Sequence, residues 1–286
     1  MYNCWKICIL RDGIVMKLLL IEGISGVGKS TMTPKICKKL CEMGFSVNCY
    51  VEGDISNPID FYCTAYFKQD DYAKLLVKYP IYSEDIENNT VIAGNIRLIR
   101  YRNNNVALFP EPLLSLLRKH EFFYKTDNPV PLSEYSRVYK TVWAQLAKNA
   151  NIRYDFMLFD GSLLHHPIND LIQNYNASYD EIVCHINSLL ESVDLCNPQI
   201  IYFSSENVAE RLHKAHISRN QAPPSFDVIN FWEERKQMDL AVMQKLSIPY
   251  EIYDISQENW DKHLYTIINN ISFEDSVKSV LDTIRE

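Results

Sequence analysis

KLLLIEGISGVGKST, residues 17–31, is the stretch that decides the fold. Its first six residues make a short, nearly continuous apolar run, which is the pattern of a strand buried on both faces of a parallel sheet. From residue 29 to 43 apolar residues recur at helical spacing, and Gly44 is the expected C-cap. A buried strand that passes through a glycine-containing loop into a helix is typical of the first unit of an α/β sheet.

The loop between this strand and this helix has the spacing of a phosphate-binding loop. Residues 23–30 match G-x-x-x-x-G-K-[ST], in which glycines let the backbone approach a ligand closely. Successive N–H groups and the positive end of the helix then face an anion. We expect Lys29 to reach the β- and γ-phosphates, the Ser30 hydroxyl to ligate Mg²⁺ and Thr31 to contact the α-phosphate. The predicted nucleotide-binding residues are Gly23, Ser25, Gly26, Val27, Gly28, Lys29, Ser30 and Thr31.

Four further strands alternate with helices along the chain. The strand pattern recurs at residues 45–51, 155–160, 199–203 and 249–255, and helical periodicity occupies 133–149, 179–193, 206–216, 228–246, 258–271 and 273–284. This alternation predicts a three-layer α/β/α sandwich around a parallel five-stranded sheet. We interpret residues 1–16 as an N-terminal extension, residues 17–286 as one domain, and residues 55–131 as a helical insertion on the substrate side.

Acidic residues follow two of these strands at the edge of the sheet that carries the loop. Asp160 ends the third strand and is the candidate that holds Mg²⁺ together with Ser30. Glu52 and Asp54 follow the second strand, where a carboxylate can accept the proton of an attacking hydroxyl. As catalytic residues we rank Asp54 first and Glu52 second. The alternative for all three is an ordinary surface carboxylate in a glycine-containing turn.

Together these segments resemble the nucleoside and nucleotide kinases of the P-loop class. The resemblance is carried by residues 21–31, by Glu52-Gly53-Asp54 after the second strand and by Phe159-Asp160-Gly161 after the third. Residues 163–170, LLHHPIND, are also similar to a segment of poorly characterised bacterial P-loop kinase-like proteins. The chain departs from thymidylate and deoxynucleoside kinases because Asp160-Gly161-Ser162 stands where they tend to carry D-R-[YFHS].

The resemblance implies a sheet order of 2-3-1-4-5, ATP and Mg²⁺ as cofactors, and an arginine-bearing lid. Residues 211–225 occupy the place of the lid, with Arg219 as the first candidate and Arg211 as the second. An arginine there would neutralise charge on the transferred phosphoryl group. Two solvated helix arginines are the alternative.

The composition limits the partners of the protein. Acidic residues outnumber Lys and Arg by 36 to 29, for a formal net charge of −7, so DNA is not an expected partner. The 8 cysteines include no C-x-x-C pair, and we expect reduced thiols in a cytoplasmic protein. No apolar run is long enough to predict a membrane span. A homodimer is left open.

Two groups of residues stay undecided at this point. His165 and His166 follow the third strand and either contact phosphate or substrate or have a structural role. Arg97, Arg100 and Arg102 either bind an acidic substrate or form a solvated face.

The leading functional hypothesis is ATP-dependent phosphoryl transfer to a hydroxyl or phosphate of a small-molecule acceptor. The alternative is a non-catalytic sensor, in which ATP binding orders the insertion and recruits a partner.

Overall fold

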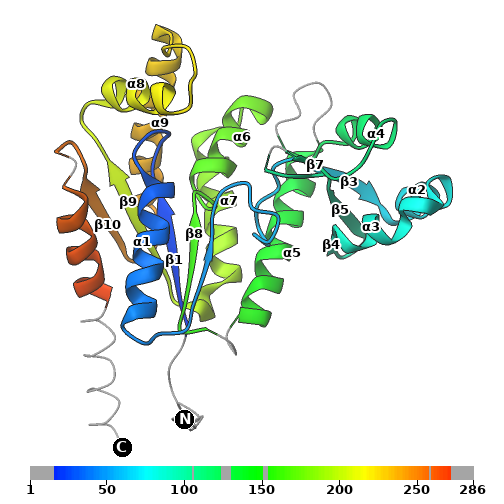
Figure 1. Cartoon of the computed structure of the whole chain (residues 1–286), viewed down its shortest axis with the longest axis horizontal. Coiled ribbons are helices and arrows are strands. Elements are labelled where there is room, and N and C mark those ends of the chain that lie inside the picture. Colours follow the sequence, from blue (N-terminus) through cyan, green and yellow to red (C-terminus); the bar gives the residue numbers. More distant parts are fainter. Residues whose placement is uncertain (1–15, 105, 124–129, 151–153, 258, 272–286) are drawn as a thin grey trace, which may run out of the picture.

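The computed structural model describes residues 16–104, 106–123, 130–150, 154–257 and 259–271. Five parallel strands form the central sheet: β1 (Lys17–Glu22), β2 (Val47–Tyr50), β8 (Phe156–Asp160), β9 (Pro198–Ser204) and β10 (Tyr250–Asp254). Their order is β10-β9-β1-β8-β2, as Figure 1 shows. Counted among themselves, these strands follow the predicted order 2-3-1-4-5. The chain therefore has a P-loop kinase-like α/β fold.

The central strand β1 is buried along its whole length, as its apolar run predicts. It pairs with β8 on one side, where Ile21 lies opposite Asp160, and with β9 on the other, where Glu22 lies opposite Tyr202. Parallel strands end at the same edge of a sheet, so the ends of β1 and β8 lie side by side there. This register brings the start of the phosphate loop next to Asp160.

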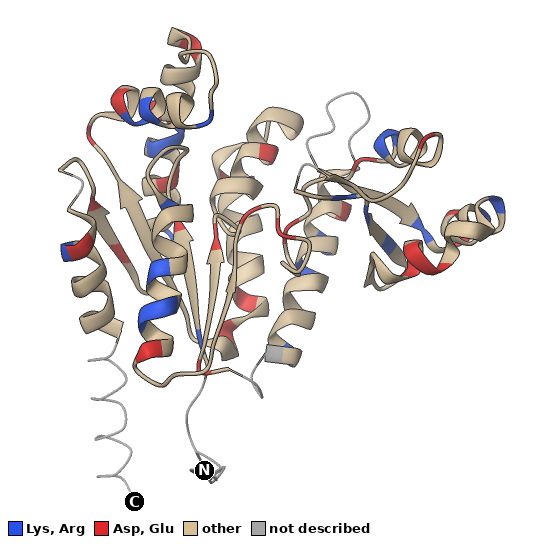
Figure 2. Ribbon diagram, in the orientation of Figure 1, with Lys and Arg blue, Asp and Glu red and all other residues tan. Residues whose placement is uncertain are grey.

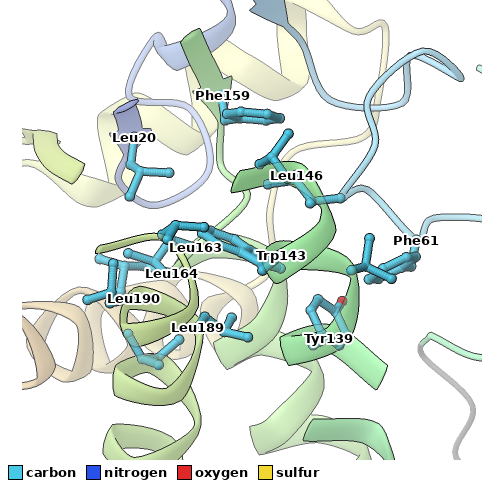
Figure 3. Close-up of a cluster of buried hydrophobic side chains, with 14 of the residues drawn as sticks. Leu20, Phe61, Tyr139, Trp143, Leu146, Phe159, Leu163, Leu164, Leu189 and Leu190 are labelled. Atoms are coloured by element: carbon cyan, nitrogen blue, oxygen red, sulfur yellow. The ribbon is translucent and has the colours of Figure 1, made fainter. Parts of the chain in front are cut away.

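Helices cover both faces of the sheet. On one face, α1 (Lys29–Glu42) and the helix at 260–271 contribute to a core with alternate residues of β1, among them Leu19 and Ile21. On the other face, Leu18 and Leu20 pack with α5 (Leu132–Ala150), α6 (His165–Tyr175), α7 (Tyr179–Ser192) and α9 (Phe226–Met243). Figure 3 shows part of this second core, in which Trp143 lies near Leu163 and Leu164. The three-layer prediction is confirmed.

The insertion forms an α+β lobe at one side of the central sheet (Figure 1), so the prediction of a helical insertion was wrong. Its strands are β3 (Thr64–Lys68), β4 (Thr90–Ala93) and β5 (Ile96–Arg100), in the antiparallel order β3-β5-β4. Gly94 has a φ of 65° in the tight connection between β4 and β5, where Ala93 pairs with Ile96. A Gly-Asn pair between two β-branched runs is a hairpin signal, and it explains the strands.

Short elements complete this lobe, which has an apolar cluster of its own. They are α2 (Gln69–Lys78), α3 (Ser83–Asn88), α4 (Leu113–Lys119), the 3₁₀ turn η1 (Pro80–Tyr82) and the hairpin of β6 (Arg102–Asn103) with β7 (Val106–Ala107). In the main domain, η2 (Asp194–Cys196) precedes β9, and α8 (Val208–Ser218) follows it.

Two predicted segments lie outside the described residues: the helix at 273–284 and nearly all of the N-terminal extension. Within the described ranges, no helix combines the length and the apolar character needed to cross a bilayer.

Candidate nucleotide site

The phosphate loop is packed tightly between two elements. Gly26 and Gly28 both have positive φ, 82° and 84°, where side chains are disfavoured. A Cβ on Gly26 would lie 2.8 Å from the backbone oxygen of Arg211 in α8. A Cβ on Gly28 would lie 2.5 Å from the indole of Trp260, which follows β10. The glycines are therefore needed for packing as well as for backbone conformation.

Lys29 lies across this loop. Its ammonium group donates to the carbonyl oxygens of Gly23 at 2.9 Å and Ile24 at 3.1 Å, and the residue is 6% exposed. Ser30 and Thr31 follow in the first turn of α1 and are exposed. The structure thus brings the predicted lysine, its two hydroxyl neighbours and the loop glycines together at the start of one helix.

Asp160 is the buried carboxylate beside the loop. It is fully buried, and neither of its oxygens makes a hydrogen bond of acceptable geometry. Burial raises its pKa, while the Lys29 ammonium and the Ser30 hydroxyl lower it. A buried carboxylate that is poorly hydrogen-bonded is costly unless a cation or a proton compensates it.

The pairing of Asp160 with Ser30 fits a magnesium site. Mg²⁺ prefers oxygen ligands and takes only one or two from protein, with the rest from water and phosphate. Among the described residues, no cluster of three or more His, Cys, Asp or Glu side chains could hold a metal by itself. Ser30 and Asp160 would therefore hold Mg²⁺ only together with a bound polyphosphate.

The two acidic candidates after β2, Glu52 and Asp54, have different surroundings in the structure. The Glu52 carboxylate lies 3.6 Å from Nε2 of His166, and its charge contributes to the raised pKa of Asp160. Asp54 instead accepts the backbone N–H of Ser56 at 2.8 Å. Glu52 is thus the carboxylate next to the metal candidate, and the geometry favours it over Asp54, the first choice from sequence. Figure 2 shows acidic residues at the end of β8 and in the loop after β2.

The two lid arginines have different surroundings. Arg211 is 5% exposed, and its guanidinium group donates to the carbonyl oxygen of Ile255 at the end of β10. This contact ties α8 to the sheet, which is a structural role that the sequence did not indicate. Arg219 follows α8 and is exposed to solvent.

A buried polar network behind the loop was missed by the sequence analysis. Glu22 is fully buried and accepts the backbone N–H groups of Leu163 at 2.7 Å and His165 at 3.0 Å. Burial is the main cause that raises its pKa to about 7, against the lowering effect of these hydrogen bonds. His165 lies 3.1 Å from the Gly23 carbonyl oxygen through Nδ1 and stacks on Trp232. The network holds the start of α6 against the phosphate loop.

A buried ion pair anchors this network to α9. Arg235 pairs with Asp239 one turn away, and both side chains are 0% exposed. Arg235 also donates to the carbonyl oxygens of Leu164 at 2.6 Å and His165 at 3.2 Å, while the Tyr202 hydroxyl donates to Asp239 at 2.9 Å. The i, i+4 spacing of Arg235 and Asp239 was the signal available in the sequence.

Comparison with known proteins gives weak similarities. No family profile and no curated protein matches the chain. One similar structure is the crystal structure of the YorR protein from Bacillus subtilis in complex with phosphorylated GDP, whose sequence is 11% identical to this chain. The match covers 91% of this chain and 98% of that chain, with a TM-score of 0.45. Deoxyadenosine kinase from M. mycoides, with dCMP and a flexible dCDP bound, is 15% identical, with coverage of 89% and 98% and a TM-score of 0.42. Similarities this low assign no activity to the chain.

Proposed function

We propose that the protein is an ATP-dependent kinase that transfers the γ-phosphoryl group to a small-molecule acceptor. The observation that carries the proposal is the fully buried carboxylate of Asp160, which lies next to Lys29 and Ser30 of the phosphate loop. A simple glycine-rich turn gives no reason to bury such a charge. The Mg²⁺ ion that accompanies a bound polyphosphate would compensate this charge.

The residues divide the chemistry among them. The loop amides and Lys29 bind the phosphates, and Lys29 exchanges its contacts with Gly23 and Ile24 for phosphate oxygens. Ser30 and Asp160 would hold Mg²⁺, which would neutralise negative charge on the β- and γ-phosphates. Glu52 lies next to Asp160 and accepts the proton of the acceptor group. Arg219 closes over the transferred group as the lid arginine.

The base and ribose of the nucleotide extend toward α8 and the loop after β10. What supports this direction is the packing of the loop, in which α8 lies against Gly26 and Trp260 lies against Gly28. The Trp260 indole also lies edge-on to Phe203 at a centroid distance of 6.3 Å, so it is held in place as an apolar surface for a base.

Nucleotide binding and turnover test the proposal together. Titration calorimetry with Mg·ATP should show binding to the native protein and a loss of at least about tenfold in affinity for Lys29→Ala, because charge-assisted contacts to phosphate are lost. Turnover of Mg·ATP should also fall in Lys29→Ala. Lys35→Ala, which changes an exposed lysine of the same helix, is the control and should leave both unchanged. Equal binding by native protein and Lys29→Ala would overturn the proposal. Binding without any Lys29-dependent turnover would favour the sensor.

A further inference from the structure

His166 is a buried histidine next to the proposed site, and the chemistry described so far does not use it. It is 9% exposed, and neither Nδ1 nor Nε2 makes a hydrogen bond. Buried polar atoms without partners are uncommon and call for an explanation. Its Nε2 lies 3.6 Å from Oε1 of Glu52.

The backbone of His166 is held rigidly. Its N–H donates to the Gly161 carbonyl oxygen at 3.1 Å, directly after β8. The ring lies edge-on between His165, at a centroid distance of 5.2 Å, and Phe123, at 5.8 Å. The buried ion pair of Arg235 fixes the start of the same helix. Glu52, by contrast, stands on a loop, and its side chain is 46% exposed.

From this geometry we propose that His166 is a positioning residue, which holds the Glu52 carboxylate toward the phosphoryl group, and that the acceptor is a hydroxyl. The inference rests on the proposed function. When the acceptor binds, Glu52 moves in from 3.6 Å to accept the Nε2–H of His166 on one carboxylate oxygen, and its other oxygen faces the acceptor. A loop carboxylate paired in this way loses rotamer freedom before the reaction begins.

The acceptor class follows from what the pair can do. In the transfer, the acceptor O–H bond breaks, its proton goes to Glu52, a bond forms from the acceptor oxygen to the γ-phosphorus, and the bond from that phosphorus to the leaving ADP oxygen breaks. A phosphate monoester arrives largely ionised at pH 7 and needs no such base. It needs cations instead, and backbone carbonyl oxygens engage two of the three arginines at residues 97–102: Arg100 donates to Ile55 and Asn57, and Arg97 to Gly94 and Ile96.

Water serves as a probe acceptor, since slow hydrolysis of Mg·ATP also requires removal of a proton from O–H. His166→Ala should lower kcat for hydrolysis roughly 10- to 100-fold. KM for ATP should change less than about twofold, because His166 binds no part of the nucleotide. His166→Gln should restore most of kcat, because its amide carries an N–H near the position of Nε2, whereas His166→Asn should not.

Two measurements decide the role of His166. Glu52→Gln combined with His166→Ala should lose no more than Glu52→Gln alone, because residues that act as one unit are not additive. His185→Gln is the matched control, since His185 is also buried but lies on α7 and bonds Ser136. It should leave kcat unchanged. Additive losses, or full kcat in His166→Ala, would overturn the role of His166.

The acceptor class is tested with alcohols offered beside their phosphate monoesters, using four deoxynucleosides and their 5′-monophosphates. Faster turnover with an alcohol supports the inference, and faster turnover with a monoester only would overturn it. Failure of the proposed function looks different, because turnover would then be insensitive to Lys29→Ala as well.

Discussion

The buried ion pair of Arg235 and Asp239 gives the sharpest prediction about stability. Arg235→Met removes the positive charge and keeps an apolar chain of similar length. It leaves the Asp239 carboxylate buried, with the Tyr202 hydroxyl as its remaining described hydrogen bond. Removing one partner of a buried ion pair lowers the free energy of unfolding by about 3–5 kcal/mol. Since domains have only about 5–15 kcal/mol of total stability, this loss should be large.

Urea unfolding at pH 7, followed by circular dichroism, measures the loss as a lower midpoint at unchanged slope. The double variant Arg235→Met/Asp239→Leu should be more stable than Arg235→Met alone, by about 1–2 kcal/mol, because no charge stays buried. Asp71→Asn is the control, as its ion pair with Lys74 is solvent-exposed, and its midpoint should not move measurably. A loss below about 1 kcal/mol in Arg235→Met, or a double variant less stable than the single one, would refute this account of the anchor.

Three further predictions concern the loop and its carboxylates. Gly28→Ala should weaken Mg·ATP binding in titration calorimetry far more than Gly44→Ala. Both glycines have positive φ, but only a Cβ on Gly28 would meet a neighbour, at 2.5 Å. Equal losses of affinity in the two variants would contradict the packing argument. Asp160→Asn should keep or raise the melting temperature of the free protein, because burial of this carboxylate outweighs the effects of Lys29 and Ser30 and raises its pKa. The stabilisation by Mg·ATP in a thermal-shift assay should shrink. A clearly less stable free protein would count against the metal role. The pKa of Glu22 rises from 4.5 in the unfolded chain to about 7 in the folded protein. Between pH 4.5 and about pH 7 the folded state therefore binds a proton that the unfolded state does not, and the free energy of unfolding falls as pH rises through this window. The urea midpoint of Glu22→Gln relative to wild type should therefore rise from pH 5 to pH 8, and a flat or falling difference would show that Glu22 does not titrate in this way.

The central fold was predictable because its signals are local. An apolar run in β1, a glycine loop and a helical repeat each depend on neighbouring residues, and the alternation of strands with helices limits the topology to few choices. The prediction of a helical insertion at residues 55–131 was wrong, although Gly94-Asn95 between two β-branched runs was a hairpin signal. Its strands pair with one another over distances that periodicity does not reveal.

The sequence by itself determined the phosphate loop, the strand that precedes it and the presence of acidic residues at the ends of β2 and β8. Only the tertiary structure shows that Glu52 lies beside His166 while Asp54 accepts the N–H of Ser56, since the two are separated by a single residue and differ in what folds against them. It also turned Arg211 inward to Ile255 and placed His166 beside Glu52. The physical reason is that the packing of α6, α8 and α9 sets the surroundings of each charge, and those surroundings cannot be read from spacing along the chain.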